Sequence, residues 1–401
     1  MDQNQKEYRS GPLKGLTPNV LWLGVVSLLA DISSEMLYPL NPIFLQSVLG
    51  APGTVIGLIE GLAEGTASIL KTVSGTISDK TGKRRSWVFV GYFISALAKP
   101  IISVASGWPL VLFARMLDRT GKGIRNSPRD ALLADSVSER SRGKAFGWHR
   151  GMDSFGAIVG PLLAILLLSR FHNNLRVIYL WAAIPGVLAA FFVFAAREIK
   201  KVVPEKMDEN VSTKLPTDFK KYLFAWAFFS IADSSDAFLL LRAKDLGADF
   251  VTVILMYCVY NFSYSFGSPY LGDLSDRVGR TRILIPGLFI FAFVYFGFAM
   301  AKDPGMIWFL FFIYGLYMAA TDGVGKALAI DLVPTKMRGR AVGTLGAVTG
   351  FATLAASLVA GVLWDHFGHS STFVFGGIGA LISVVLFLIL LPRKTTSPKS
   401  C

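Results

Sequence analysis

The segment GTISDKTGKRR, residues 75–85, returns later in the chain as GDLSDRVGRTR, residues 272–282. A second segment, LLADSVSERSRGKAFG at residues 132–147, has a similar counterpart, LAIDLVPTKMRGRAVG, at residues 328–343. The two pairs of segments have nearly the same separation along the sequence. Two independent matches at one spacing indicate that the chain is duplicated, with one copy of each motif in each half.

Long apolar stretches surround both copies. Of the 401 residues, 53% are hydrophobic and only 17% are charged, whereas soluble proteins carry roughly a quarter charged residues. The stretches approach the ~20 residues that a helix needs to cross a bilayer core. They are continuous rather than alternating, which argues against a membrane barrel. Twelve spans are expected, beginning near Leu16, Gly53, Ser86, Pro109, Ala145, Leu175, Phe219, Phe250, Ile283, Met306, Arg340 and Thr372.

These features predict an all-α membrane protein with twelve transmembrane helices in two pseudo-symmetric six-helix bundles. The expected parts are an N-terminal tail (1–15), a first bundle (16–196), a Lys-rich linker (197–218), a second bundle (219–391) and a C-terminal tail (392–401). Two related bundles with a site near mid-membrane are typical of secondary transporters.

The positions of the basic residues predict the topology. The net charge is +13, and most of the 40 Lys and Arg fall in the termini and in the connections that follow every second span. The connections on the other side hold only Arg170, Arg176, Arg242, Lys244 and Lys302. The positive-inside rule therefore places both termini in the cytoplasm, with the chain as a multi-pass protein of the inner membrane. The basic charge is thus a topology signal and does not indicate a nucleic-acid partner.

Several functional classes lack support in the sequence. No small-residue cleavage site follows a short apolar region at the N-terminus, so the first apolar run is expected to stay as a spanning helix. The cysteines, Cys258 and Cys401, cannot support a disulfide framework. The four histidines show no metal-ligand spacing. Because no nucleophile–base pair or phosphate loop is recognisable either, we expect a protein that is not an enzyme and that has no metal or cofactor.

The repeated loop resembles a motif of a known family. GTISDKTGKRR is similar to the loop between helices 2 and 3 of the major facilitator superfamily (MFS). The matching positions are Gly75, Asp79, Lys80, Gly82, Lys83 and Arg84, and in the second copy Gly272, Asp276, Arg277, Gly279 and Arg280, with Thr281 where a base is usual. The resemblance implies a twelve-helix, usually monomeric transporter that works by alternating access.

The chemistry of this loop fits a cytoplasmic gate. Its glycines permit a tight turn, and a carboxylate at a helix end can pair with bases or cap the N-terminus of a neighbouring helix. Such contacts would hold the cytoplasmic side together in one state and release in another. The alternative is a solvated charged turn that serves only the topology.

The fifth expected span resembles a second MFS motif. In GWHRGMDSFGAIVGPLLA, residues 147–164, the positions Gly147, Gly156, Gly160 and Pro161 look like the helix 5 signature of superfamily antiporters. Ala164 and Ile165 replace the glycine pair that continues the family pattern. Gly156 and Gly160 also form a small-xxx-small stripe, so ordinary close helix packing is the alternative. In the fourth span, Arg119 and Gly123 fit a further family spacing, with Arg115 as a competing position.

Charged residues inside the expected spans are candidates for the transport site, because such charges are costly in a bilayer. Asp31 and Glu35 lie one turn apart, as do Glu60 and Glu64, and we expect these four acids to carry coupling protons. The expected substrate cavity comprises Tyr38, Asn41, Lys99, Arg115, Asp118, Arg119, Lys122, Arg150, Asp153, Asp233, Asp236, Asp322 and Lys326. The alternative for these charges is a structural network of salt bridges.

Prolines predict irregular helices at two places. Pro39 and Pro42 remove backbone donors and bend the first span, where Asn41 would offer its amide to the cavity. Pro128 is expected to interrupt the fourth span, and Asp118 in the same span is expected to pair with Arg115 or Lys122.

The sequence thus predicts an alternating-access carrier that exports a small organic solute in exchange for protons. Its expected partners are the lipid bilayer, the solute and protons. Proton-driven uptake of an organic anion or a siderophore-type metal chelate is the alternative, because bases are abundant inside the spans. A lipid translocator is a third possibility.

Overall fold

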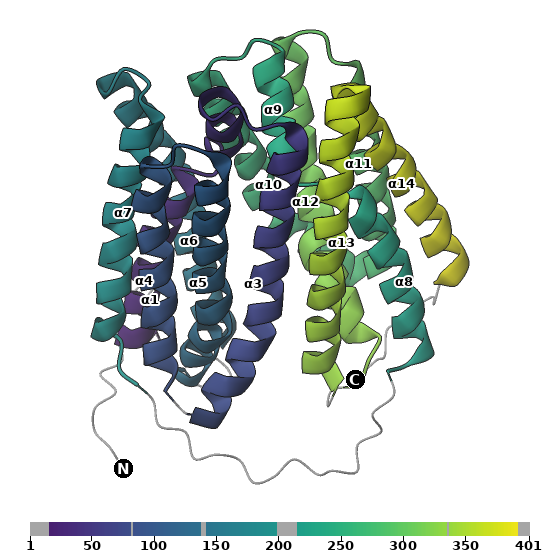
Figure 1. Cartoon of the computed structure of the whole chain (residues 1–401). Coiled ribbons are helices and arrows are strands. Elements are labelled where there is room, and N and C mark those ends of the chain that lie inside the picture. The colour runs from purple at the N-terminus through teal and green to yellow at the C-terminus, as the bar shows by residue number, and fades with distance from the viewer. Residues whose placement is uncertain (1–15, 82, 138–141, 199–214, 335–336, 392–401) are drawn as a thin grey trace, which may run out of the picture. The chain divides into compact units, whose positions relative to one another are not determined.

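The structure is a computed structural model that describes residues 16–81, 83–137, 142–198, 215–334 and 337–391, shown in Figure 1. The regular structure in these ranges is helical, without strands. The long helices of the first half are α1 (Pro18–Glu35), α3 (Gly53–Thr81), α4 (Arg84–Ser103), α5 (Trp108–Asp135), α6 (Arg142–Arg170) and α7 (Leu175–Phe192). Those of the second are α8 (Thr217–Ala232), α10 (Phe250–Val278), α11 (Arg280–Met300), α12 (Pro304–Asp331), α13 (Arg338–Phe367) and α14 (His369–Leu390), with the short α9 (Ala237–Asp245) after α8.

These helices confirm the predicted fold class, since each expected span coincides with one of them. Ten spans in the described ranges are long and apolar enough to cross a membrane. The other two long helices, α1 and α5, carry polar and charged residues along their length, which lowers their hydropathy.

The first span is broken where its prolines predict. Helix α1 ends at Glu35, and a turn, the short α2 (Asn41–Ile43) and a π-helical turn (Phe44–Val48) follow it. The prediction for Pro128 is wrong: α5 continues through this proline without interruption. Proline is tolerated in membrane helices because local adjustments satisfy the backbone groups that it frees.

The seventh span is also broken, although it contains no proline. Helix α8 ends at Ala232, and residues 233–236 are not helical before α9 begins. The backbone N–H of Ser235 donates to Ser357 Oγ of α13 (3.3 Å), and the N–H of Ala237 donates to Ser235 Oγ (3.3 Å). Hydroxyl groups thus replace part of the backbone bonding that the helix loses.

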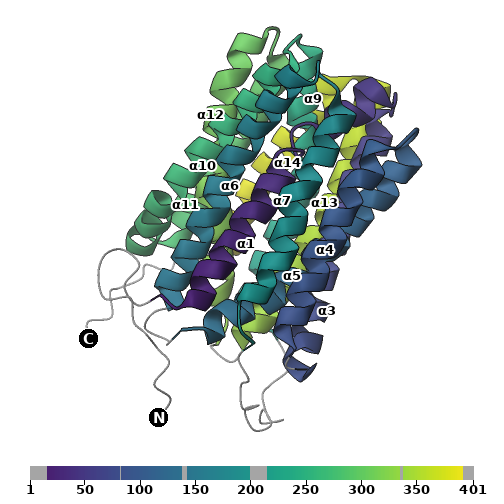
Figure 2. The ribbon, with the colours of Figure 1, turned by 90° about the vertical axis from the view of Figure 1, so that its left-hand side faces the viewer.

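The chain divides into two compact units. Residues 1–44 and 66–209 form the first, so it contains α1, the second half of α3, and α4 to α7. Helix α1 packs against α6 and α7, as Figure 2 shows, and α4 packs against α5 and α7. A methyl group on Gly91 of α4 would lie 2.6 Å from the carbonyl oxygen of Gly121 on α5. Only glycine permits this approach of the two backbones.

The second unit comprises residues 45–65 and 210–401, so the first half of α3 belongs to it. Helix α10 packs against α12, α11 against α12 and α14, and α8 against α13 and α14. The carboxylate of Asp365 in α13 accepts from the backbone N–H groups of Gly53 (2.8 Å) and Thr54 (2.7 Å). It therefore caps the N-terminus of α3.

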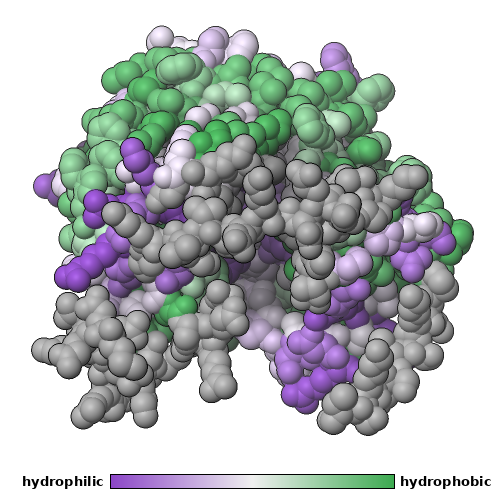
Figure 3. All heavy atoms as spheres, turned by 90° about the horizontal axis from the view of Figure 1, so that it is seen from below, coloured by the Kyte–Doolittle hydropathy of each residue, from purple (hydrophilic) through white to green (hydrophobic). Residues whose placement is uncertain are grey.

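The surface of the described helices suits a lipid environment. Large apolar side chains are exposed on many of them, among them Phe155, Leu166, Phe224, Phe293 and Leu388. Hydrophilic side chains are visible at the end of the molecule seen in Figure 3. Exposed apolar helix faces are what a multi-pass membrane protein presents to lipid.

Candidate functional site

The acids of α1 face the glycines of α6. A methyl group on Gly156 would lie 2.8 Å from Cβ of Asp31, and one on Gly160 would lie 3.1 Å from Cβ of Glu35. The two helices therefore run side by side in the same direction, with the helix 5 signature against the two acids. Gly147, the first position of the signature, lies in the first turns of α6, and Pro161 is buried in the middle of this helix.

Close packing at this contact yields a stability prediction. A methyl group on Gly160 would lie 2.8 Å from the carbonyl oxygen of Ile32 and 3.0 Å from the backbone nitrogen of Met36. We expect Gly160→Ala to lower the free energy of unfolding by about 1–3 kcal/mol, because backbone atoms cannot yield as side chains do. Thermal unfolding of the purified protein in detergent measures the effect.

Gly151 is the matched control in the same helix. It is exposed, and a methyl group there would meet nothing within 4 Å. Gly151→Ala should leave the unfolding temperature unchanged or raise it, since alanine favours helix by up to ~1 kcal/mol. Equal stability of the two variants would disprove the close α1–α6 contact.

A polar pair on α6 extends the acidic region. The carboxylate of Asp153 accepts a hydrogen bond from Ser27 Oγ of α1, and its Oδ2 lies 3.5 Å from Nδ1 of His149. Asp153 is a predicted cavity residue, whereas His149 is not predicted. Arg150, also predicted for the cavity, is exposed.

Buried bases gather between α4 and α5. Lys99, Arg115, Arg119 and Arg125 are all buried. The carboxylate of Asp118 lies 3.7 Å from Arg115, one of its two predicted partners, and 3.8 Å from Arg119. The site thus concentrates positive charge inside the first unit, around the carboxylate of Asp118.

Arg125 is a further member of this group. Its Nη1 donates to Ser95 Oγ (2.7 Å), and its guanidinium lies 4.3 Å from the ring centroid of Tyr92. A cation over an aromatic face is favourable when it is buried. The helical spacing of arginines in α5 was the signal that could have identified Arg125.

The remaining predicted residues of the first unit differ in their surroundings. Asn41 is buried, and its Oδ1 accepts a hydrogen bond from Tyr179 Oη of α7 (2.7 Å). The amide oxygen of Asn41 therefore has a partner within the first unit. Tyr38 lies in the turn after α1, and both Tyr38 and Lys122 are half-buried.

In the second unit, the break between α8 and α9 places two acids against tyrosines. Tyr314 Oη donates to Asp236 (2.6 Å), and Tyr317 Oη donates to Asp233 (3.3 Å). Both tyrosines belong to α12 and are buried. The rings of Tyr260 and Tyr314 lie 5.3 Å apart, which adds an aromatic wall beside Asp236.

More carboxylates of this unit lie nearby. Glu60, which is buried, and Glu64 lie on the part of α3 that belongs to the second unit, and both interact electrostatically with Asp236. Asp322 accepts from Tyr264 Oη (2.9 Å) and pairs with Lys326 (2.6 Å). The second unit thus combines acids with tyrosines, in contrast to the buried bases of the first.

Removal of one hydroxyl tests the acid–tyrosine contacts. Tyr314→Phe should lower the free energy of unfolding by about 1–3 kcal/mol, because Asp236 loses a short hydrogen bond in a buried setting. Tyr270, which is 72% exposed, supplies the control Tyr270→Phe. Chemical or thermal unfolding in detergent should separate the two variants, and equal curves would show that the Tyr314–Asp236 bond contributes nothing.

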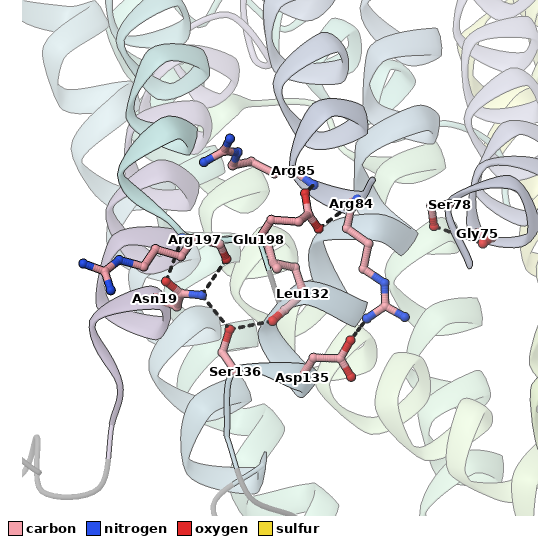
Figure 4. A network of polar contacts seen from close by, with 10 residues as sticks. All are labelled: Asn19, Gly75, Ser78, Arg84, Arg85, Leu132, Asp135, Ser136, Arg197 and Glu198. Carbon is pink, nitrogen blue, oxygen red and sulfur yellow. Dashed lines mark hydrogen bonds and ion pairs between the residues drawn. The ribbon is translucent and has the colours of Figure 1, made fainter. Parts of the chain in front are cut away.

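The first copy of the loop motif enters a polar network at the helix ends (Figure 4). Arg84 forms an ion pair with Asp135 at the end of α5. The carboxylate of Glu198, which follows α7, accepts from the backbone N–H groups of Arg84 (3.0 Å) and Arg85 (2.8 Å). Glu198 therefore caps the N-terminus of α4 and satisfies two of its free donors.

Asn19 of α1 joins the same network. Its Nδ2 donates to Ser136 Oγ (3.2 Å) and to the carbonyl oxygen of Arg197 (2.9 Å), while its Oδ1 accepts from the N–H of Arg197 (2.9 Å). Sequence reasoning missed Asn19 and Glu198, because a single polar residue at a helix end has no spacing signal.

The other positions of the first copy contribute less. Lys83 is exposed at the N-cap of α4. Gly75 lies against Ser127 of α5, and a methyl group added at Gly75 would lie 3.1 Å from Cβ of Ser127. Gly82 and the side chains of Asp79 and Lys80 lie outside the described part of the structure.

The second copy forms a similar but more exposed network. Arg280 pairs with Asp276 and with Asp331 (3.2 Å) at the end of α12. Gly279 has φ +104°, a backbone conformation that favours glycine. A methyl group added at Gly272 would meet nothing within 4 Å. Arg277 pairs with Asp273 (2.7 Å) in solvent. Arg280 occupies the position that is equivalent to Lys83 in the first copy, whereas the partner of Asp135 there is Arg84, the next residue. The ion pair at the end of α12 is thus formed from a position one residue earlier in the motif.

The long apolar helices and the charges buried among them are those of a multi-pass membrane transporter. Residues 23–241 and 228–400 each match the Major Facilitator Superfamily. The chain belongs to this superfamily and is a secondary transporter.

Relatives and solved structures agree with this assignment. An uncharacterised MFS-type transporter of Methanocaldococcus jannaschii is 34% identical over 382 residues, which cover 94% of this chain and 95% of that protein. The multi-drug resistance efflux pump PmrA of Streptococcus pneumoniae is 25% identical over 400 residues, 94% of this chain and 97% of the pump. The crystal structure of the nucleoside transporter NupG has a TM-score of 0.74 at 14% identity, covering 94% of this chain and 99% of that one.

Proposed function

We propose that the protein exports a small organic solute in exchange for protons. The contact that carries the proposal is that of Asp31 and Glu35 with Gly156 and Gly160, because it joins two intramembrane acids to an antiporter-like signature. The similarity to a multidrug efflux pump supports the outward direction. We also propose that the protein is a monomer of the inner membrane with both termini in the cytoplasm, and that the proton is its only coupling partner.

The proposed cycle uses the acids as exchangeable sites. A charged carboxylate inside a bilayer is costly, so it binds either a proton or a cationic or polar group of the solute. Protons that enter from outside neutralise Asp31 and Glu35 and release the solute. Loss of the protons to the cytoplasm restores the carboxylates for the next solute. Glu60 and Glu64 are proposed as further proton sites.

Everted membrane vesicles test this proposal. The vesicles are acidified inside, loaded with a pH-sensitive dye, and given cationic drugs, zwitterions, organic anions and siderophores in turn. Export by antiport predicts that one class dissipates the gradient in wild-type vesicles and not in Asp31→Asn vesicles. If no class does so, the carrier is not an antiporter for these solutes, and uptake by intact cells becomes the decisive assay.

The buried bases of α4 and α5 favour a second candidate function. Arg115, Arg119 and Lys99 could bind an anionic group, which suits proton-driven uptake of an organic anion or metal chelate. Accumulation of a radiolabelled anion by intact cells, abolished by a protonophore, would support this function over export.

A further inference from the structure

His149 is a buried titratable residue that the proposed cycle does not yet use. It lies on α6 and is only 4% exposed. Its Nε2 has no hydrogen-bond partner in the part of the chain that the structure describes. A buried polar atom without a partner costs free energy, and in native proteins such an atom calls for an explanation.

Polar contacts lead from His149 toward Asp31. Nδ1 of His149 lies 3.5 Å from Oδ2 of Asp153, one turn further along α6. The other oxygen of Asp153 accepts the hydrogen bond from Ser27 Oγ on α1. Asp31 lies one turn beyond Ser27, beside Gly156. Titratable groups therefore follow one another at successive turns of two parallel helices.

His149 and Asp31, the two ends of this line of polar groups, share charged neighbours. His149 interacts with Arg129 and Asp130 of α5 and with Arg150 and Asp153 of α6. Asp31 interacts with Asp153 of α6, with Glu35 of α1, and with Arg125 and Arg129 of α5. Because Asp153 and Arg129 act electrostatically on both groups, they link the protonation of one group to that of the other.

We propose that His149 is the group through which Asp31 exchanges its proton with the cytoplasmic side. The inference rests on the proposed proton-coupled function. One proton moves from the Asp31 carboxyl to Asp153, and then to Nδ1 of His149. The resulting imidazolium releases the proton from Nε2 to water on the cytoplasmic side. A turn of the imidazole ring then presents its unprotonated nitrogen to Asp153 for the next proton, while Asp31 is reloaded from outside. Ser27 holds the Asp153 carboxylate toward α1 and is a positioning residue.

The direction of the line agrees with this role. His149 lies nearer the start of α6 than Asp153 does, and Ser27 lies nearer the start of α1 than Asp31 does. Both helices start on the side that the positive-inside rule assigns to the cytoplasm. Imidazole suits the task because its two nitrogens can accept a proton on one side and release one on the other.

Histidine NMR tests the coupling without any substrate. The chain has only four histidines, so ring 15N labelling gives signals from four imidazole rings, and His149→Gln identifies those of His149. We expect the midpoint of the His149 titration to move by about half a pH unit or more in Asp31→Asn and in Asp153→Asn. Asp303→Asn, at the exposed N-cap of α12, is the control and should leave the midpoint in place. A His149 signal that does not titrate, or that ignores Asp31→Asn, overturns the proposal.

Flux measurements then test the role in transport. With ethidium as the probe in everted vesicles, His149→Gln should lower proton-driven flux about tenfold and leave ethidium binding unchanged. His366→Gln, at an exposed histidine of α13, is the matched control. Full proton-driven flux in His149→Gln would overturn the assigned role. If His149→Gln does not fold, Ser27→Ala replaces it. Unaltered flux in Ser27→Ala would then contradict proton transfer from Asp31 through Asp153 to His149.

The two proposals fail in different ways. If wild-type vesicles show no ethidium-linked proton movement, the proposed export fails for this probe, and the NMR titrations alone decide the link between His149 and Asp31. If the vesicles couple protons to ethidium but His149 titrates independently of Asp31, only the assignment of His149 fails.

Discussion

Asp31→Asn is expected to reduce proton-driven solute flux at least about 100-fold, while exchange of internal for external solute continues. Asparagine keeps the shape of the side chain beside Gly156 but cannot carry a proton, so only steps that require protonation should stop. Proteoliposomes with a substrate from the vesicle panel separate the two activities. Driven flux requires a pH gradient, whereas exchange requires only labelled solute on one side.

Asp273→Asn is the control for this measurement. Asp273 pairs with Arg277 at the exposed end of α10, and 59% of its side chain is exposed. Its replacement should leave both activities near the wild-type values. If Asp31→Asn retained full proton-driven flux, the assignment of Asp31 would be wrong. If it lost driven flux and exchange together, Asp31 would act in solute binding.

Arg84→Gln is expected to lower the free energy of unfolding by about 3–5 kcal/mol, because it breaks the buried ion pair with Asp135 from one side. The side chains of Arg84 and Asp135 are only 14% and 5% exposed. Unfolding in detergent, followed by the loss of monodisperse protein on heating, measures the effect.

Arg277→Gln is the matched control at the other copy of the motif. Its side chain is 73% exposed, and its ion pair with Asp273 is surrounded by solvent. Exposed pairs contribute little, about 0–1 kcal/mol. A double variant, Arg84→Gln with Asp135→Asn, should recover part of the stability that Arg84→Gln loses. Equal losses in Arg84→Gln and Arg277→Gln would contradict a buried, stabilising ion pair.

The fold was predictable from the sequence because its signals are local and repeated. Apolar stretches mark the spans, and the two copies of the loop motif mark the halves. The break after α1 was predictable as well, since Pro39 and Pro42 cannot donate backbone hydrogen bonds. Pro128 shows the limit of this rule, because α5 stays helical around it.

The break between α8 and α9 has a weaker signal. Its sequence, ADSSDAF, contains no proline. Its aspartate and serine side chains can bond to backbone groups in non-helical conformations, but this disfavours a helix only slightly. The partner that Ser235 finds, Ser357, lies on α13, far away in the sequence. The break therefore depends on tertiary contacts that no local pattern records.

The candidate site was predictable as a set of residues but not as pairs. Acids and bases inside apolar spans are recognisable because such charges are costly in a bilayer. The spacing left two possible partners for Asp118, Arg115 and Lys122. The association of Glu60 with Asp236, and that of Asp153 with Ser27, depend on which helices are neighbours. Glu198 and Asn19 are found only through backbone groups that the fold brings to them.

The two ion pairs at the ends of α5 and α12 should respond differently to ionic strength. Arg84–Asp135 is buried, whereas the side chains of Arg280 and Asp331 are 24% and 52% exposed. Mobile ions screen exposed charges over about 8 Å at physiological salt and over about 3 Å at 1 M, but they reach buried pairs much less. Rising salt should therefore loosen the contact between α11 and the end of α12 first, while the equivalent contact in the first unit stays closed. The duplicated halves have thus diverged in how strongly the surrounding electrolyte acts on them.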